Sequence, residues 1–588
     1  MEDRTAPVSP AATTPGSASP ETASLDAAFP DAAAELVATL ADEGVEHLFI
    51  NPGTDTAPVQ EALAAARANG TPHPRSVLCT HEFVALSAAM GHHFAGGGPQ
   101  AVMVHVDAGT LNLGGAIHNA QRNRVPVVIF AGRTPYSISA DVPGHRDAYI
   151  HWQQEQPDQQ AILRAFGKWT MEVPRGRELG GIVRRAYQVA RSDPSGPAYV
   201  MLPREALMEQ GGAWPSRRLH PPRPAAPDPG GLAELARTLA DASRPVIVTG
   251  RTGANPESVA ALVELAELIG SPVIDHQDRL NFPPRHPLFA GSDFDGADEL
   301  RAADVVLLLD AEVPWIPVQA APPRDAVVLQ IDTDCVKHTM PTWTYPIELA
   351  LTASTAVALP LLTAELRGLA TTDRQARWRE RRATTSERLE KKRTEWAGLA
   401  VAEPPDAMLQ ALDRALPPEA VVLEESVTNR AAVIRQVSRD PGHRFGTGSP
   451  ALGWGIAGAL GVKLARPDSP VISIVGDGAF NFGVPTSAIW SAQKAGAPFI
   501  AFILNNRAYR ASKLPVQRLF PKGVADAESD FPETDLSPAA DYVLLAQAYG
   551  GDGRVVERPE DLPSALDACL EVQAAGRCAV LDVRLPVA

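Results

Sequence analysis

The stretch that decides the fold is Val471-Ile472-Ser473-Ile474-Val475-Gly476-Asp477-Gly478. A second apolar stretch, residues 499–504, leads into the pair Asn505-Asn506. Two short apolar runs with a helix-compatible segment between them are typical of a βαβ unit in a parallel sheet. Such a unit places the polar residues after both strands at the sheet edge where open α/β sheets bind ligands. Carboxylate and amide oxygens there suit Mg²⁺ holding a diphosphate, and glycine lets backbone amides approach the phosphate.

This arrangement resembles the GDG…NN signature of thiamine-diphosphate (ThDP) enzymes. The resemblance implies that Asp477 and Asn506 bind a metal ion through their side chains, and Ala508 through its carbonyl oxygen. The alternative is a strand-end turn beside an ordinary polar pair, which the paired strands and their spacing disfavour. The cofactor-binding residues implied here are Gly476, Asp477, Gly478, Ala479 and Asn506.

A second match to the same family lies far upstream, at residues 81–91. His81-Glu82 and the small residues behind them resemble the family's HE-x-x-A-x-x-x-A-x-G segment, in which the Glu opens a buried helix. The alanines recur at helical spacing and allow close packing. The resemblance implies that Glu82 is catalytic: it would bond pyrimidine N1′, favour the imino tautomer and help form the ylid at thiazolium C2. The alternative role for a first-turn Glu is that of a favourable partner for the helix dipole.

Three further residues match the pyrimidine side of the family. The turn at residues 51–53, after an apolar strand, resembles the F-x-x-PGG entry loop, in which Pro52 lies near the pyrimidine. Residues 107–112 resemble the S-G-P-G-A-T-N segment of acetolactate synthases at Gly109 and Asn112, whereas Asp107 departs from it. These matches assign Pro52, Gly109 and Asn112 to cofactor binding.

On the diphosphate side, residues 449–455 resemble the G-T-M-G-F-G loop of acetolactate synthases. By that resemblance Leu452 is the apolar wedge beneath the bent ThDP. The carbonyl of Pro450 would accept a hydrogen bond from the 4′-amino group of the cofactor. The alternative for Leu452 is an ordinary core position.

The composition is that of an ordinary soluble globular chain. It has 588 residues, 45% of them hydrophobic and 21% charged, so about three domains are expected. The net charge of −16 argues against nucleic-acid binding. The four cysteines form no CxxC pair, and no apolar run is long enough for a membrane span. Residues 1–25 are rich in Ala, Ser, Thr and Pro, which predicts a disordered tail rather than a signal peptide, and a cytoplasmic location is expected.

We predict an α/β chain with three doubly wound parallel-sheet domains. Short apolar strands alternate with helical patterns, and a Pro-rich linker opens the middle block. Between residues 372 and 403 acids and bases are mixed at helical spacing, which favours a solvated linker helix over an acid-binding patch. The resemblance covers roughly residues 30–588 and implies a pyrimidine-binding domain at 26–212, a central Rossmann-like domain at 231–371 and a diphosphate-binding domain at 404–588. The composition and charge pattern add the tail at 1–25, a linker at 213–230 and a charged linker helix at 372–403.

The middle block carries no dinucleotide fingerprint. Residues 250–255 do not form G-x-G-x-x-G. Related acetolactate synthases keep FAD in this block, and the segments that hold it there are replaced here at residues 290–294 and 310–315. These departures put FAD in doubt, and the cofactors expected are ThDP and Mg²⁺.

The leading hypothesis from the resemblance is a ThDP- and Mg²⁺-dependent lyase or carboligase that acts on a 2-oxo acid through a C2 ylid, as acetolactate synthases do. The first alternative is a 2-hydroxyacyl-CoA lyase, or a decarboxylase of a 2-oxo acid or an acyl-CoA, because residues 149–155 and 313–315 distantly resemble actinobacterial 2-hydroxyacyl-CoA lyases. A flavin or nicotinamide oxidoreductase and a non-catalytic cofactor-binding scaffold are hypotheses of other classes.

The family holds its cofactor between the first domain of one subunit and the third domain of another. The resemblance therefore implies that Glu82 and Asp477 meet across a subunit interface, in a homodimer or homotetramer. The expected partner is a small 2-oxo acid or acyl-CoA substrate, with no nucleic acid and no membrane. Candidate substrate-facing residues are His118, Arg133, His145, His151, Tyr509 and Arg510.

Overall fold

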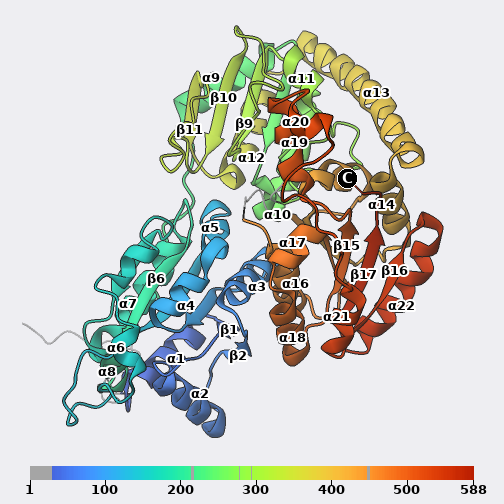
Figure 1. Ribbon diagram of the computed structural model, residues 1–588. Helices are drawn as coiled ribbons and strands as arrows, with labels where there is room; N and C mark the ends of the chain where they lie inside the picture. Colours follow the sequence, from blue (N-terminus) through green and yellow to red (C-terminus); the bar gives the residue numbers. More distant parts are fainter. Residues whose placement is uncertain (1–28, 213–216, 277–278, 293–294, 447–450, 588) are drawn as a thin grey trace, which may run out of the picture.

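Three separate parallel β-sheets, each covered by helices, make up the computed structural model (Figure 1). The structure describes residues 29–212, 217–276, 279–292, 295–446 and 451–587. The strand pairings within the three sheets are all parallel in these residues. The predicted fold class, α/β with three parallel-sheet domains, is confirmed. The tail predicted at residues 1–25 lies outside the described residues.

The first sheet lies at the lower left of Figure 1. Its strands are β1 (His47–Ile50), β2 (Arg75–Leu78), β3 (Gln100–Val104), β4 (Val127–Arg133), β5 (Trp169–Glu172) and β6 (Ala198–Pro203). They follow the order β2-β1-β3-β4-β6-β5. β3 and β6 are buried along their whole length, as expected when helices cover both faces of a parallel sheet. The helices are α1 (Ala32–Asp42), α2 (Ala57–Asn69), α3 (Glu82–Phe94), α4 (Val106–Asn112), α5 (Gly114–Arg122), α6 (Ile150–Gln153), α7 (Leu179–Arg191) and α8 (Arg204–Met208).

The second sheet forms the upper part of the molecule in Figure 1. Its strands are β7 (Pro245–Thr249), β8 (Val273–Asp275), β9 (Val305–Leu309), β10 (Val327–Asp332) and β11 (Leu349–Thr352), in the order β11-β10-β9-β7-β8. Its helices are α9 (Pro229–Asp241), α10 (Pro256–Ile269), α11 (Ala297–Ala302) and α12 (Thr355–Gly368). β7 and β9 are fully buried, because helices pack on both faces here as well.

A long charged helix, α13 (Thr372–Ala402), runs along the outside of the second domain toward the third (Figure 1). Despite the density of charge, Trp378, Leu389 and Trp396 are buried. These three residues fall on one face of a 3.6-residue helix, so α13 packs a narrow apolar stripe on the protein and turns its charges outward.

The third sheet contains the stretch that decides the fold. Its strands are β12 (Val421–Glu425), β13 (Arg444–Gly446), β14 (Val471–Gly476), β15 (Ile500–Asn505), β16 (Asp552–Val556) and β17 (Ala579–Arg584), in the order β13-β12-β14-β15-β17-β16. β14 and β15 pair in parallel, as the βαβ pattern predicts. The helices are α14 (Pro404–Ala415), α15 (Arg430–Gln436), α16 (Trp454–Ala465), α17 (Asp477–Phe482), α18 (Pro485–Ala495), α19 (Arg510–Leu519), α20 (Val524–Ala527), α21 (Tyr542–Ala548) and α22 (Leu562–Ala574).

The first and third domains of the chain pack together through α3 and α16. Glycine lets the two backbones touch: a Cβ at Gly461 would collide with the carbonyl oxygen of Ala88. A Cβ at Gly91 would likewise collide with the carbonyl oxygen of Gly458. One apolar cluster continues across this contact. The small residues of α3 therefore allow its close contact with α16.

No helix among the described residues combines the length and apolar character needed to cross a bilayer.

Candidate active site

The carboxyl ends of β12, β14 and β15 lie side by side at one edge of the third sheet. β12 and β14 are neighbours although β13 separates them in the sequence, so the direction of winding reverses between them. Open α/β sheets bind ligands at such a point. Asp477 directly follows β14, and Asn506 directly follows β15. The structure therefore brings both predicted metal ligands to the edge at which a ligand is expected.

Asp477 is buried, and one of its carboxylate oxygens is unpaired. Oδ1 accepts a hydrogen bond from the Gly478 N–H at 2.9 Å, whereas Oδ2 is buried without a partner among the described residues. Burial raises the pKa of Asp477, and nearby backbone amides, among them those of Arg507 and Ala508, oppose the effect. The side-chain oxygen of Asn506, also buried, accepts from the Ala508 N–H at 3.1 Å. A buried carboxylate oxygen without a partner, in a neighbourhood of amide oxygens, suits a hard divalent cation such as Mg²⁺.

The glycines around Asp477 differ in the space beside them. A Cβ at Gly478 would lie 2.5 Å from the ring of Tyr509, so that ring packs directly on the first turn of α17. A Cβ at Gly476 would meet no atom within 4 Å. A ligand can therefore approach the backbone closely at Gly476, which is what diphosphate binding requires. Ala479 is buried in the same turn of α17.

Glu425, the last residue of β12, holds the loop that precedes α16. Its carboxylate accepts hydrogen bonds from three backbone N–H groups: Gly453 at 2.8 Å, Trp454 at 3.2 Å and Gly455 at 2.7 Å. Gly453 has a φ of +97°, a conformation that glycine adopts without strain. Burial raises the pKa of Glu425 to about 8, although the hydrogen bonds from the three backbone amides act to lower it. This carboxylate fixes the backbone immediately after Leu452.

Leu452 is half-buried and packs against the apolar cluster shared by α3 and α16. The residue before it, Ala451, is tied to the first domain, because its carbonyl accepts from Asn119 Nδ2 at 2.8 Å. The loop is therefore held on both sides of Leu452, whose role as a wedge stays a prediction. Pro450 lies outside the described residues.

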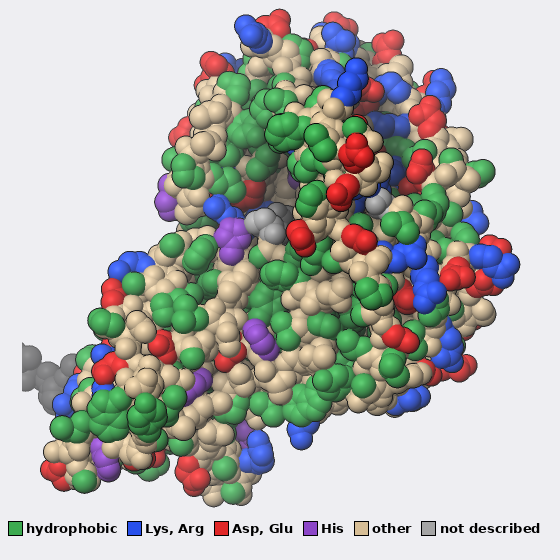
Figure 2. Space-filling model, in the orientation of Figure 1, with side chains coloured by type: hydrophobic (Ala, Val, Ile, Leu, Met, Phe, Trp, Pro, Cys, Tyr) green, Lys and Arg blue, Asp and Glu red, His purple; other side chains and the backbone are tan. Residues whose placement is uncertain are grey.

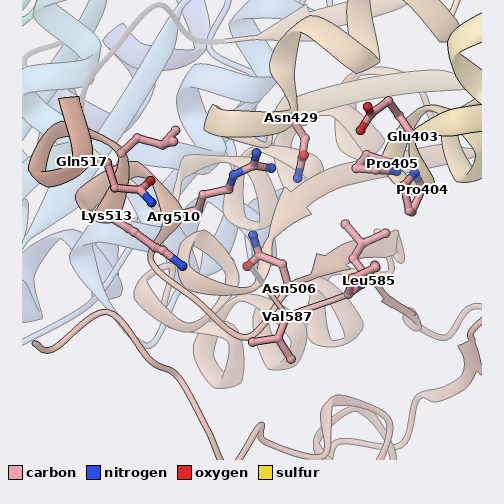
Figure 3. Close-up of a pocket in the computed structure, with 12 residues that line it drawn as sticks. Glu403, Pro404, Pro405, Asn429, Asn506, Arg510, Lys513, Gln517, Leu585 and Val587 are labelled. Atoms are coloured by element: carbon pink, nitrogen blue, oxygen red, sulfur yellow. The ribbon is translucent and has the colours of Figure 1, made fainter. Parts of the chain in front are cut away.

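A pocket of about 320 Å³ opens beside Asn506 (Figure 3). Figure 3 shows the guanidinium of Arg510 pointing toward the carboxamide of Asn429, with Asn506 below them. Lys513, on the same helix α19 as Arg510, also lines the pocket. These two cations and the carboxamides of Asn429, Asn506 and Gln517 offer hydrogen-bond donors to an anion, and the carboxylate of Glu403 also lines the pocket.

Glu82 lies at the start of α3 and is held by two asparagines. Asn51 Nδ2 donates to Glu82 Oε1 at 2.9 Å, and Asn112 Nδ2 donates to Glu82 Oε2 at 3.1 Å. The carboxylate is only 4% exposed. Gly109 packs close to this carboxylate, because a Cβ there would lie 3.0 Å from Glu82 Oε1. The structure thus brings Glu82, Gly109 and Asn112 together, and Pro52 follows Asn51 in the same turn.

A histidine and an aspartate lie at the same sheet edge as Glu82. His105 directly follows β3, and its Nδ1 donates to Asp55 Oδ1 through a short contact. Its Nε2 donates to Gln154 Oε1 at 3.0 Å. Burial alone would lower the pKa of His105, but the hydrogen bond and charge of Asp55 outweigh it, so the pKa is raised. The next residue, Val106, has a φ of +29°, which is strained for a β-branched side chain and marks a sharp turn at this position.

The other substrate-facing candidates are spread over the first domain. His151 is buried, with its Nε2 3.3 Å from Thr54 Oγ1, next to Asp55. Arg133 is paired instead with Glu172 at 3.2 Å. The rings of His118 and Phe166 pack edge to face, and His145 Nδ1 bonds the carbonyl of Val142.

Sequence reasoning missed four residues of this site: Asn51, Asp55, His105 and Glu425. A signal was present, because each lies at or within five residues of the carboxyl end of a strand, the edge where ligands bind. His105 directly follows the apolar run that forms β3, so its position in the sequence already placed it at that edge.

Polar residues therefore gather at two sheet edges: Asp477 and Asn506 in the third domain, and the buried Glu82 with the His105–Asp55 pair in the first. Three family models match this division. "Thiamine pyrophosphate enzyme, N-terminal TPP binding domain" matches residues 30–162, the central domain matches residues 232–359, and the C-terminal TPP binding domain matches residues 427–583. The chain belongs to the thiamine pyrophosphate enzyme family. The resemblance drawn from the sequence is confirmed, and with it the assignment of the chain as a ThDP-dependent enzyme.

Relatives of this ThDP-dependent enzyme span decarboxylases and synthases. Benzoylformate decarboxylase of Pseudomonas aeruginosa is 28% identical over 92% of this chain and 97% of its own. The large subunit of acetolactate synthase isozyme 3 of Escherichia coli is 24% identical over 94% of each chain. Among solved structures, the ThDP-dependent 4-hydroxybenzoylformate decarboxylase of Rhodococcus jostii RHA1 shares the fold with a TM-score of 0.76, covering 94% of this chain and 99% of that one, at 24% identity.

Proposed function

We propose that this ThDP-dependent enzyme is a Mg²⁺-dependent lyase that decarboxylates a 2-oxo acid to an aldehyde. Mg²⁺ would be held by Asp477, Asn506 and the carbonyl of Ala508, and the cofactor's pyrimidine would face Glu82. The unpaired Oδ2 of Asp477 and the open space at Gly476 support this placement. When bound, ThDP supplies the carbanion chemistry by which a 2-oxo acid loses CO₂.

The observation that most strongly supports a decarboxylase is the pairing of His105 with Asp55. Decarboxylation of R–CO–COO⁻ with uptake of H⁺ gives R–CHO and CO₂, so one proton must reach the former carbonyl carbon. Both ring nitrogens of His105 face oxygen acceptors, which favours the doubly protonated ring. Asp55 thus keeps a proton on His105, and Gln154 orients the Nε2–H. An acid of this kind suits aldehyde release.

Replacing Asp55 with Asn tests this role of His105. Because the carboxylate raises the pKa of His105, its removal lowers that pKa, and the protonated ring is lost at a lower pH. The alkaline limb of kcat/KM, which reports the free enzyme's essential acid, is therefore expected to move to lower pH. Measuring the pH profile beside Asp141→Asn, an exposed aspartate of the same domain, provides the control. An alkaline limb that stays in place would remove His105 as the acid.

The proposal includes assembly with a second copy of the chain. Apolar side chains near both sheet edges are exposed, including Leu111 at 60%, next to Asn112, and Phe482 at 53%, at the end of the helix that Asp477 begins. Figure 2 shows further apolar side chains gathered at the lower left of this face, in the region of α6 and α8, where Tyr149, Trp152 and Met208 are exposed. Apolar surface of this kind marks an interaction site, and a homodimer or homotetramer would cover it.

The reaction is tested with purified protein, ThDP and Mg²⁺, supplied separately with benzoylformate and pyruvate. Equal amounts of CO₂ and aldehyde are expected from at least one of them. Acetolactate from pyruvate would replace the decarboxylase with a carboligase, the second candidate, which the acetolactate synthase relative and the loop around Leu452 favour. Absence of CO₂ from 2-oxo acids by ThDP-loaded protein would overturn both and favour a hydroxyacyl-CoA substrate.

A further inference from the structure

Two histidines and a glutamate cluster at the amino end of β1, the opposite end of that strand from Asn51 and Glu82. Glu46 and His47 stand at the start of β1, and His92 lies in the last turns of α3. Each of the three side chains can place one ligand atom within 4.8 Å of the other two. A four-residue strand spans about 13 Å, so this cluster is separate from the active site.

Two imidazole nitrogens of the cluster, His47 Nδ1 and His92 Nε2, are buried without a hydrogen-bond partner among the described residues. His92 is only 1% exposed. The two rings meet edge to face with their centroids 5.0 Å apart. Glu46 Oε2 lies 3.6 Å from His92 Nε2, beyond ordinary hydrogen-bond length. Buried polar atoms are usually paired, so two unpaired imidazole nitrogens in a cluster with one carboxylate favour a shared ligand.

The protonation states of the cluster suit a metal ion. Burial lowers the pKa of His47 and of His92 to about 4, so both rings are neutral at pH 7 and each offers a lone pair. The side chain of Glu46 is 62% exposed, which gives a charged ligand and a route from solvent. Arg75, the nearby cation, donates to the carbonyl of Ala495 at 2.7 Å. Two neutral imidazoles and one carboxylate are ligands that Zn²⁺ takes in proteins.

We propose that His47, His92 and Glu46 bind a divalent first-row metal ion, Zn²⁺ being the best match, with the remaining coordination position open to water. Gln100 Nε2 lies 3.0 Å from His92 Nδ1 and also donates to the carbonyl oxygen of Gly98 through a short contact. This contact holds the His92 ring on its Nδ1 side and leaves Nε2 as the ring nitrogen nearest Glu46.

Zn²⁺ titration of chelator-treated protein, in competition with a chromophoric chelator and with excess Mg²⁺ present to fill the Asp477 site, tests the proposal. About one Zn²⁺ per chain is expected to bind, with affinity weakened roughly tenfold or more in Glu46→Gln and in His92→Gln. Glu46→Gln changes an exposed side chain and therefore keeps the fold. His338→Gln, which removes an exposed histidine, is the matched control and is expected to bind as wild type does.

Substitution of Co²⁺ gives a second readout, because four- or five-coordinate Co²⁺ bound to imidazole absorbs visible light more strongly than the hydrated ion. This absorption is expected in wild type and in His338→Gln and is expected to be lost in Glu46→Gln. Equal Zn²⁺ affinity in wild type and in both cluster variants would overturn the proposal, and so would the absence of Zn²⁺ binding to wild type.

Discussion

Glu82→Gln is expected to lose about 10²- to 10⁴-fold in kcat while ThDP stays bound. The amide has nearly the size of the carboxylate but can neither take up nor release a proton, and proton transfer by a positioned group is worth about that factor. The surroundings of Glu82 add to the loss, because Asn51 and Asn112 each donate to one of its oxygens. In the variant one of these donors must face an NH₂ group. The measurement pairs kcat with the affinity for ThDP from calorimetry.

The control for Glu82 is Glu61→Gln, the same exchange at an exposed position of α2 in the same domain. It is expected to behave as wild type in both kcat and ThDP affinity. Loss of ThDP binding in Glu82→Gln would assign the residue to cofactor binding rather than proton transfer. Turnover equal to that of wild type would remove Glu82 from the reaction.

The sequence predicts those parts of the site that depend only on residues close together in the chain. β14 and the start of α17 follow from one apolar run and the glycines that end it, and the position of Asn506 follows from the next run. Both depend on the alternation of strand and helix and on the rule that parallel strands end at one edge. The helical recurrence of small residues in α3 likewise predicted its close packing, although not that α16 is the partner.

The parts that could not be predicted depend on contacts between distant residues. Asn51 lies 31 residues from Glu82 along the chain, and Asp55 lies 50 residues from His105. No local periodicity encodes such pairs. The turn at Val106 opposes the conformational preference of its own residue type, so it exists only because the surrounding structure imposes it. The apolar stripe of α13 was hidden among charges because only four of its 31 residues are buried, about one in every two turns.

Asp477→Ala is expected to weaken Mg²⁺-dependent ThDP binding by about 100-fold or more. Loss of a residue that only supports a metal ligand costs about 10- to 100-fold in metal affinity, and loss of a direct ligand costs at least as much. The protein without ligands is expected to melt at the wild-type temperature or above it. The reason is that the substitution removes a buried carboxylate oxygen that has no partner among the described residues. Calorimetric titration of ThDP with and without Mg²⁺, and thermal melts in both conditions, measure the two effects.

The combination of these two results separates a ligand role for Asp477 from a structural one. If Asp477 only held β14 and α17 together, its loss would lower the melting temperature of the unliganded protein. If Asp477 binds the metal ion, its loss would reduce only the increase in melting temperature that ThDP and Mg²⁺ produce, because bound molecules stabilise the folded state that binds them. Asp530→Ala, at an exposed position of the same domain, should keep both the affinity and that increase. If Asp477→Ala keeps the Mg²⁺-dependent affinity of wild type, the metal ion is bound elsewhere, and the unpaired oxygen of Asp477 is then a cost of the fold with no ligand to offset it.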